Sequence, residues 1–143
     1  MGILTDFVIA NDDEGDAIGK ALRPADRWPT LEAKGVDPIN LSTLYCAITG
    51  TNYSNSIQKS FQLAGGNQDE GPWIFKFPNN ILESFASIQP ANIQAVAEKW
   101  AATEELKMGR WSSTDAAEFI RLLHEHSQNA LTKKACMFLW LSL

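Results

Sequence analysis

The side chains most capable of chemistry in this chain form a run of carboxylates near its N-terminus. Asp12, Asp13, Glu14 and Asp16 lie close together, and carboxylate oxygens are preferred ligands of Ca²⁺ and Mg²⁺. An EF-hand loop would also need ligands at alternate positions, Gly at the sixth and Glu at the twelfth, and no register of this run supplies that set. Asn11 and the acidic residues instead suit a helix N-terminus, which favours a capping side chain and early carboxylates. We therefore interpret the run as a solvated first turn, with weak cation binding as the alternative.

Two histidines raise the question of a metal site. Residues two apart on a helix point about 200° from each other, so His124 and His126 cannot face one ion. A metal site would need further ligands, and no matching His or Cys pair occurs elsewhere in the chain. We expect these histidines on a solvated helix face with Glu125 between them, and we expect no metal or other cofactor.

Other catalytic signatures are incomplete. Residues 15–21 resemble a phosphate-binding loop, but the glycines are too close together and Ala follows the Lys where that motif has Ser or Thr. There is no Gly-x-Ser-x-Gly elbow, and Cys46 and Cys136 have apolar neighbours, which favours buried thiols. The carboxylate pairs Asp69-Glu70 and Glu104-Glu105 have no evident general-acid partner, so we expect them on the surface.

Tryptophan is the most unusual feature of the composition, because the chain holds five of them. A Trp side chain is both a large core residue and a favoured anchor at binding surfaces. Trp100 and Trp140 lie in apolar segments and are predicted to be core residues. Trp28, Trp73 and Trp111 lie beside prolines or before a helix, and for these three both core packing and a recognition surface remain open.

Length and charge limit the classes of protein that this chain can belong to. Its 143 residues suit one domain, and 17 acidic against 12 basic residues give a net charge of −5. That charge argues against nucleic acid or an anionic membrane as a partner. There is no secretory signal pattern and no apolar stretch near 18 residues, which predicts a soluble cytoplasmic protein. The excess charge is local, since residues 1–19 hold five acids and no Lys or Arg.

Apolar periodicity predicts a small sheet. Residues 3–9 are rich in β-branched side chains, and residues 57–63 alternate apolar with polar side chains, as in a half-buried strand. Residues 73–77 would complete a hairpin around the turn at 65–71, although a helix over 56–63 competes with this interpretation. The seven apolar residues 135–141 predict a strand that is buried on both faces and central in the sheet.

Helices are predicted between these strands. They are expected from Asn11 to about Leu22, from Asn40 to Gly50, from Asn79, from Pro90 to about Lys107, and from Ser112 through Leu131. Ser112 and Asp115 have the spacing of a capping box, and the last helix is expected to bury a face that ends at Leu131. The stretch from Pro24 to Pro38 is expected to be mostly loop. The sequence therefore predicts one α+β domain over residues 1–143, with four to five helices packed against a small sheet.

Four phrases together resemble a group of small uncharacterised bacterial proteins. They are Gly71-Pro-Trp-Ile-Phe-Lys-Phe-Pro78, Trp100-Ala-Ala-Thr-Glu-Glu105, Trp111-Ser-Ser and the closing Phe138-Leu-Trp-Leu-Ser-Leu143. More loosely, Thr49-Gly50 and Gly71-Pro72 match the outline of the YfbM-like family. The resemblance implies an α+β fold and a bacterial origin, and it supplies no activity.

Three functional hypotheses follow from these features. The leading one is a non-enzymatic binding protein for a protein or small-molecule partner. Its candidate contacts are Trp28, Trp73, Trp111, Asp12, Asp13 and Glu14. One alternative is a small carboxylate-based, hydrolase-like enzyme that uses Asp12, Asp13 or Glu70 beside Trp73. It predicts a concave pocket that holds a carboxylate of raised pKa. Another alternative is an immunity-like protein that neutralises a toxin through its acidic face.

Overall fold

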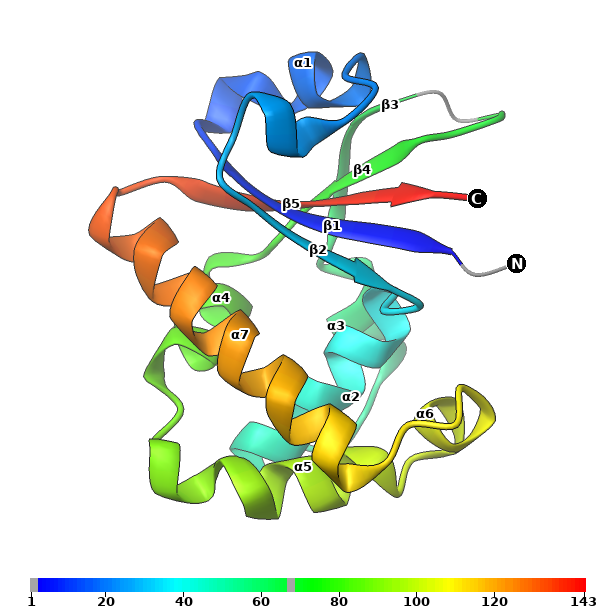
Figure 1. Ribbon diagram of the computed structural model, residues 1–143, viewed down its shortest axis with the longest axis vertical. Coiled ribbons are helices and arrows are strands. Elements are labelled where there is room, and N and C mark those ends of the chain that lie inside the picture. Colours follow the sequence, from blue (N-terminus) through cyan, green and yellow to red (C-terminus); the bar gives the residue numbers. More distant parts are fainter. Residues whose placement is uncertain (1–2, 67–68) are drawn as a thin grey trace.

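An antiparallel sheet of five strands runs through the molecule in the computed structural model, which describes residues 3–66 and 69–143 (Figure 1). The strands lie in the order β2-β1-β5-β4-β3, and each pair of neighbours is antiparallel. The strands are β1 (Leu4–Ala10), β2 (Thr30–Lys34), β3 (Gln62–Gly66), β4 (Trp73–Lys76) and β5 (Cys136–Ser142).

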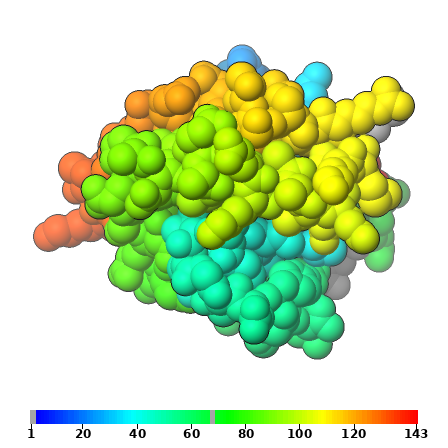
Figure 2. Space-filling view, turned by 90° about the horizontal axis from the view of Figure 1, so that it is seen from below, coloured from blue at the N-terminus to red at the C-terminus, as the bar shows by residue number. Residues whose placement is uncertain are grey.

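Helices lie on both faces of the sheet, but unequally (Figure 1). They are α1 (Gly15–Gly19), α2 (Pro38–Thr49), α3 (Asn55–Lys59), α4 (Asn79–Ser87), α5 (Ile93–Ala101), α6 (Glu104–Met108) and α7 (Ser113–Thr132). Helices α2 to α7 form a layer on one face, here called the helical face, and Figure 2 shows this layer from below. Residues 11–29, which include α1, pack on the opposite face, here called the outer face. The predicted α+β fold is confirmed.

Strand alternation divides the apolar side chains between two clusters. Phe7 and Leu139 point to the helical face, where they join a large core built from the helices. Val8 and Phe138 point the other way and pack against Ile18 of α1. The segment over residues 11–29 therefore has a small core of its own beneath it.

Strand β5 lies at the centre of the sheet, as its unbroken apolar run predicted. It pairs with β1 on one side and with β4 on the other. Residues Met137 to Trp140 are all buried, because both faces of the strand are covered over this length.

The helix predictions are partly right. The capping box of Ser112 and Asp115 opens α7, and Gly50 ends α2 in the left-handed conformation with a φ of 77°. Helix α2 begins earlier than predicted, because Asp37 caps it and Pro38 occupies its first turn. Leu131 is 41% exposed, so the buried face of α7 ends before it. No helix in the described ranges is both long enough and apolar enough to cross a membrane.

Two strand predictions need correction. Residues 57–63 do not form one strand: α3 occupies Asn55–Lys59, and β3 begins at Gln62. The predicted hairpin exists with this shorter first strand, and positions 67 and 68 of its turn lie outside the described residues. Part of the expected loop between Pro24 and Pro38 is strand β2, which pairs with β1 over Thr30–Lys34. Leu31 and Ala33 alternate with polar residues and pack on the helical core, but the segment is only five residues long and follows Pro29, so the prolines dominated its interpretation as a loop.

Close packing explains the glycines that imitate a phosphate-binding loop. A Cβ atom on Gly15 would lie 2.4 Å from the carbonyl oxygen of Ala64, and one on Gly65 would lie 2.5 Å from the carbonyl oxygen of Gly15. Helix α1 therefore rests directly on the backbone of β3, which only glycine at these positions permits.

Candidate functional site: a pocket on the outer face of the sheet

The register of three strands places an acidic and aromatic row on the outer face. Asp6 of β1 is the direct partner of Glu32 on β2 and of Trp140 on β5. Directly opposed residues of antiparallel strands have Cβ atoms about 4.5–5.5 Å apart, so the three side chains are neighbours. Asp6 shares the outer face with Val8, two residues further along β1.

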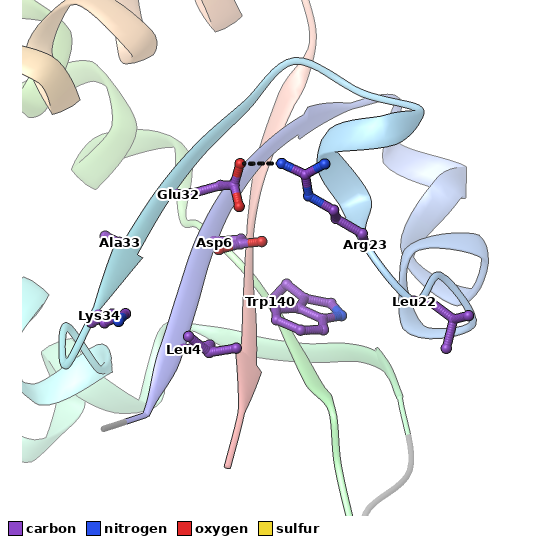
Figure 3. Close-up of a pocket in the computed structure, with 8 residues that line it drawn as sticks. All are labelled: Leu4, Asp6, Leu22, Arg23, Glu32, Ala33, Lys34 and Trp140. Carbon is purple, nitrogen blue, oxygen red and sulfur yellow. Dashed lines mark hydrogen bonds and ion pairs between the residues drawn. The ribbon is translucent and has the colours of Figure 1, made fainter. Parts of the chain in front are cut away.

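A pocket of about 390 Å³ opens over this row (Figure 3). Residues 11–29 cover one end of the outer face, over Val8 and Phe138, and the pocket lies towards the other end. Its lining includes Leu4, Asp6, Leu22, Arg23, Glu32 and Trp140. Leu22 is 98% exposed at the rim of the pocket. An apolar side chain in contact with water contributes no hydrophobic stabilisation to the fold.

Asp6 is the most unusual group in the pocket. Only 6% of the residue is exposed, yet its side chain makes no hydrogen bond or ion pair with any residue in the part of the chain that the structure describes. The pKa of its carboxyl is raised to about 6, first by burial and then by the neighbouring carboxylate of Glu32, while Arg23 partly opposes the rise. Asp6 therefore changes charge close to neutral pH, unlike an ordinary Asp.

Arg23 does not neutralise Asp6 by direct contact. Its guanidinium nitrogens lie 3.1 Å from Glu32 and 3.3 Å from Asp26, and both ion pairs are exposed. Figure 3 shows the guanidinium directed at Glu32, with Asp6 lying below this pair. Arg23 thus holds Glu32 at the edge of the pocket and leaves the Asp6 carboxyl without a partner among the groups drawn there.

Trp140 adds a second polar group without a partner. The residue is 7% exposed, and within the described residues no acceptor lies within hydrogen-bond reach of its buried Nε1. In Figure 3 its indole ring lies between Asp6 and Leu22, with the nitrogen on the Leu22 side. By contrast, Nε1 of Trp100 donates to the carbonyl oxygen of Asn40 at 2.9 Å. Buried indole N–H groups usually find such a partner, so Trp140 is the exception.

Trp28 and Glu14, two residues singled out from the sequence, act together in the structure. Trp28 is 8% exposed, and its Nε1 donates to a Glu14 carboxylate oxygen at 3.0 Å. The other Glu14 oxygen accepts from the backbone N–H of Asn11 at 2.8 Å. The Asn11 bond and then the Trp28 bond lower the pKa of the Glu14 carboxyl. Both side chains therefore hold residues 11–29 together beside the pocket.

The rest of the acidic run lies outside the pocket. Asp12 forms an ion pair with Lys76 of β4, which raises the pKa of that Lys. Asp13 and Asp16 are exposed. Among the described residues no three His, Cys, Asp or Glu side chains are placed to hold a metal ion.

Trp73 and Trp111 do not line the pocket beside Asp6. Trp73 lines a groove of about 540 Å³ between the helical face and α2–α3, together with Phe61, Phe75 and other apolar side chains. Trp111 packs on Trp100, with ring centroids 5.6 Å apart, and on Phe119. The structure therefore does not gather the three candidate tryptophans into one site, and Trp73 shares no pocket with the acidic run.

The histidines are not on a solvated face, contrary to prediction. His124 Nδ1 lies 3.0 Å from the carbonyl oxygen of Phe85, and His126 Nε2 lies 2.7 Å from that of Phe7. Burial lowers the pKa of His126. The two rings contact different elements, α4 and β1, and so they fasten α7 to both.

Comparison with protein-family models, with curated proteins and with solved structures found no match. The resemblance to YfbM-like proteins and the bacterial origin therefore stay predictions. The site has to be interpreted from its own chemistry.

Sequence reasoning overlooked Asp6, Glu32, Arg23 and the pocket position of Trp140. The signal for Asp6 was present, because a carboxylate at the centre of an apolar strand shares a face with Leu4 and Val8. Such a residue becomes a buried polar group, which demands either a partner or a function.

Proposed function

We propose that this protein is a small-molecule-binding protein and that its ligand occupies the pocket beside Asp6. The observation that carries the proposal is a buried carboxyl that has no partner in the described part of the chain and borders a cavity. A buried polar group without a partner costs stability, and proteins tolerate that cost mainly at functional sites.

Two further features support this proposal. A volume of about 390 Å³ lies within the range of about 300–1,000 Å³ that is typical of ligand pockets. The lining combines apolar side chains with few polar ones, which is also typical of such pockets. The proposal keeps the non-enzymatic binding role inferred from the sequence and places it at residues other than those singled out there.

One observation favours an enzyme as the second candidate function. A carboxyl with a pKa of about 6 can give or take a proton near neutral pH, and Glu32 beside it is a second carboxylate. The carboxylate-based, hydrolase-like alternative thus moves from Asp12, Asp13 or Glu70 to Asp6 and Glu32. Hydrolysis of nitrophenyl esters, phosphates or glycosides that disappears in Asp6→Asn would favour this candidate. The immunity-like role and the cytoplasmic location stay predictions.

The binding proposal predicts a ligand that depends on Asp6. Native mass spectrometry of protein purified from the cells that produce it is expected to show a bound small molecule in the wild type. We expect Asp6→Asn to lose this species, because the variant removes the charge and keeps the side-chain shape. Asp13→Asn makes the same chemical change at an exposed carboxylate and is expected to retain it. A bound species that survives Asp6→Asn and is lost from Asp13→Asn would place the site at the acidic run and refute the proposal.

A further inference from the structure

We propose that the ligand of this pocket is an organic cation, with a single ammonium or guanidinium group on an apolar body. This inference rests on the proposed function and specifies its ligand. It is drawn from the charges that surround Asp6 and from the side chains that border its carboxyl.

The charged groups around Asp6 leave its carboxylate without a close counterion. From β2, Glu32 and Lys34 border the pocket, and from the segment over residues 11–29, Arg23 borders it with Asp26 as its partner. The charged side chains that line the pocket are therefore two acids, Asp6 and Glu32, and two bases, whose formal charges cancel when Asp6 is ionised. Arg23 is already engaged with two carboxylates. Lys34 is exposed, so the buried Asp6 carboxylate has no ion-pair partner among the described residues, and a ligand with one positive charge would supply that partner.

The neighbours of Asp6 suit a cation with an apolar body. Trp140 lies next to Asp6 on β5, and indole rings attract organic cations through their π electrons. A carboxylate gives ammonium and guanidinium groups strong charge-assisted hydrogen bonds. Leu4 and Leu22 supply apolar surface on either side of the ring (Figure 3). One end of the pocket can hold the charge while the rest covers a hydrocarbon body.

Other ligand classes fit less well. An anion would meet Asp6 and Glu32, which repel it and, when ionised, donate no hydrogen bond. Of the two bases in the lining, Arg23 is already engaged with two carboxylates and Lys34 is exposed. A divalent metal ion needs more ligands than the two carboxylates of this row provide. A neutral apolar molecule would leave the Asp6 charge buried without a counterion, which is costly.

The affinity for a cation should depend on pH, whereas the affinity for a neutral ligand should not. With a pKa of about 6, the Asp6 carboxyl is about 10/11 ionised at pH 7 and about 1/11 ionised at pH 5. A cation that needs the ionised form should therefore bind about 10-fold more weakly at pH 5 than at pH 7. A ligand that does not contact the charge should show little change.

Three probes of similar shape test the inference: phenethylammonium, 2-phenylethanol and 3-phenylpropionate. Binding is followed by the NMR signal of the Trp140 indole N–H, which is identified by its absence in Trp140→Phe. We expect phenethylammonium to shift this signal saturably and to bind at least 10-fold more tightly than either other probe. We expect about 10-fold weaker binding in Asp6→Asn and at pH 5, and unchanged binding in Asp13→Asn.

The outcomes separate this inference from the proposed function. Equal or tighter binding of the alcohol or the carboxylate at this signal would overturn the cation and leave a binding pocket in place. If phenethylammonium does not shift the signal, the cation is overturned, and the native mass spectra of the wild type and Asp6→Asn decide the proposed function separately. Phenethylammonium binding that is indifferent to Asp6→Asn would also overturn the inference, because the charge would then play no part.

Discussion

Trp100→Ala is expected to lower the free energy of unfolding by about 3–5 kcal/mol, the usual cost of deleting a large aromatic side chain from a core. Trp100 is fully buried, and its ring packs against Trp111 and Phe119. Its Nε1 donates to Asn40 of α2, so the substitution also removes a hydrogen bond between α5 and α2. Urea unfolding followed by circular dichroism measures the loss.

The matched control for this prediction is Trp73→Ala. Trp73 is only half-buried and lines an open groove, so we expect its replacement to cost about 1 kcal/mol. Equal losses in the two variants would contradict the division of the tryptophans between the helical core and the surface groove.

The second large effect has the opposite sign, because Asp6→Asn is expected to stabilise the protein at pH 7. Raising a carboxyl pKa from 3.8 to about 6 corresponds to about 3 kcal/mol in favour of the protonated form. Water in the pocket screens part of this cost, so we expect a gain of about 2 kcal/mol. A stabilising substitution at a buried polar residue is the pattern of a site kept for function.

The pH dependence identifies the cause of that gain. Because the folded-state pKa lies above the unfolded value, the wild type loses stability as the pH rises from about 4 through 6. The gain from Asp6→Asn should therefore fall to about a fifth of its full size at pH 4 and be complete by pH 7. Protonation of His126 is common to both proteins, so their difference isolates Asp6. Asp13→Asn should change stability by less than about 0.5 kcal/mol at either pH. An Asp6→Asn variant that is less stable than the wild type at pH 7 would contradict this account.

Much of the fold was predictable where the pattern is local. The apolar run that became β5 indicated a central strand by itself, and the Ser112–Asp115 spacing located the start of α7. Helix α3 was harder to predict, because Ile57, Phe61 and Leu63 alternate with polar residues as in a strand. The segment instead changes from helix to strand near Phe61. Strand β2 was missed because its alternation of Leu31 and Ala33 with polar residues is only five residues long and lies in a stretch that prolines mark as loop.

The candidate site was less predictable than the fold for a related reason. The carboxylates that stand out in the sequence are adjacent along the chain, whereas Asp6 and Glu32 are 26 positions apart and meet only through the strand register. Trp140 was rightly expected to be buried, but its unpaired N–H depends on which side chains surround the indole. Sequence patterns show which residues are apolar, and tertiary pairing decides which polar groups are left without partners.

Titration of the Asp6 carboxyl decides whether this group is the charge that binds the cation. It can be measured by following the ¹³C shift of that carboxyl against pH, with and without phenethylammonium. The account predicts a pKa of about 6 in the free protein and a lower value when the cation is bound, because a nearby positive charge favours the ionised form. A pKa near 3.8 that phenethylammonium does not change would contradict it.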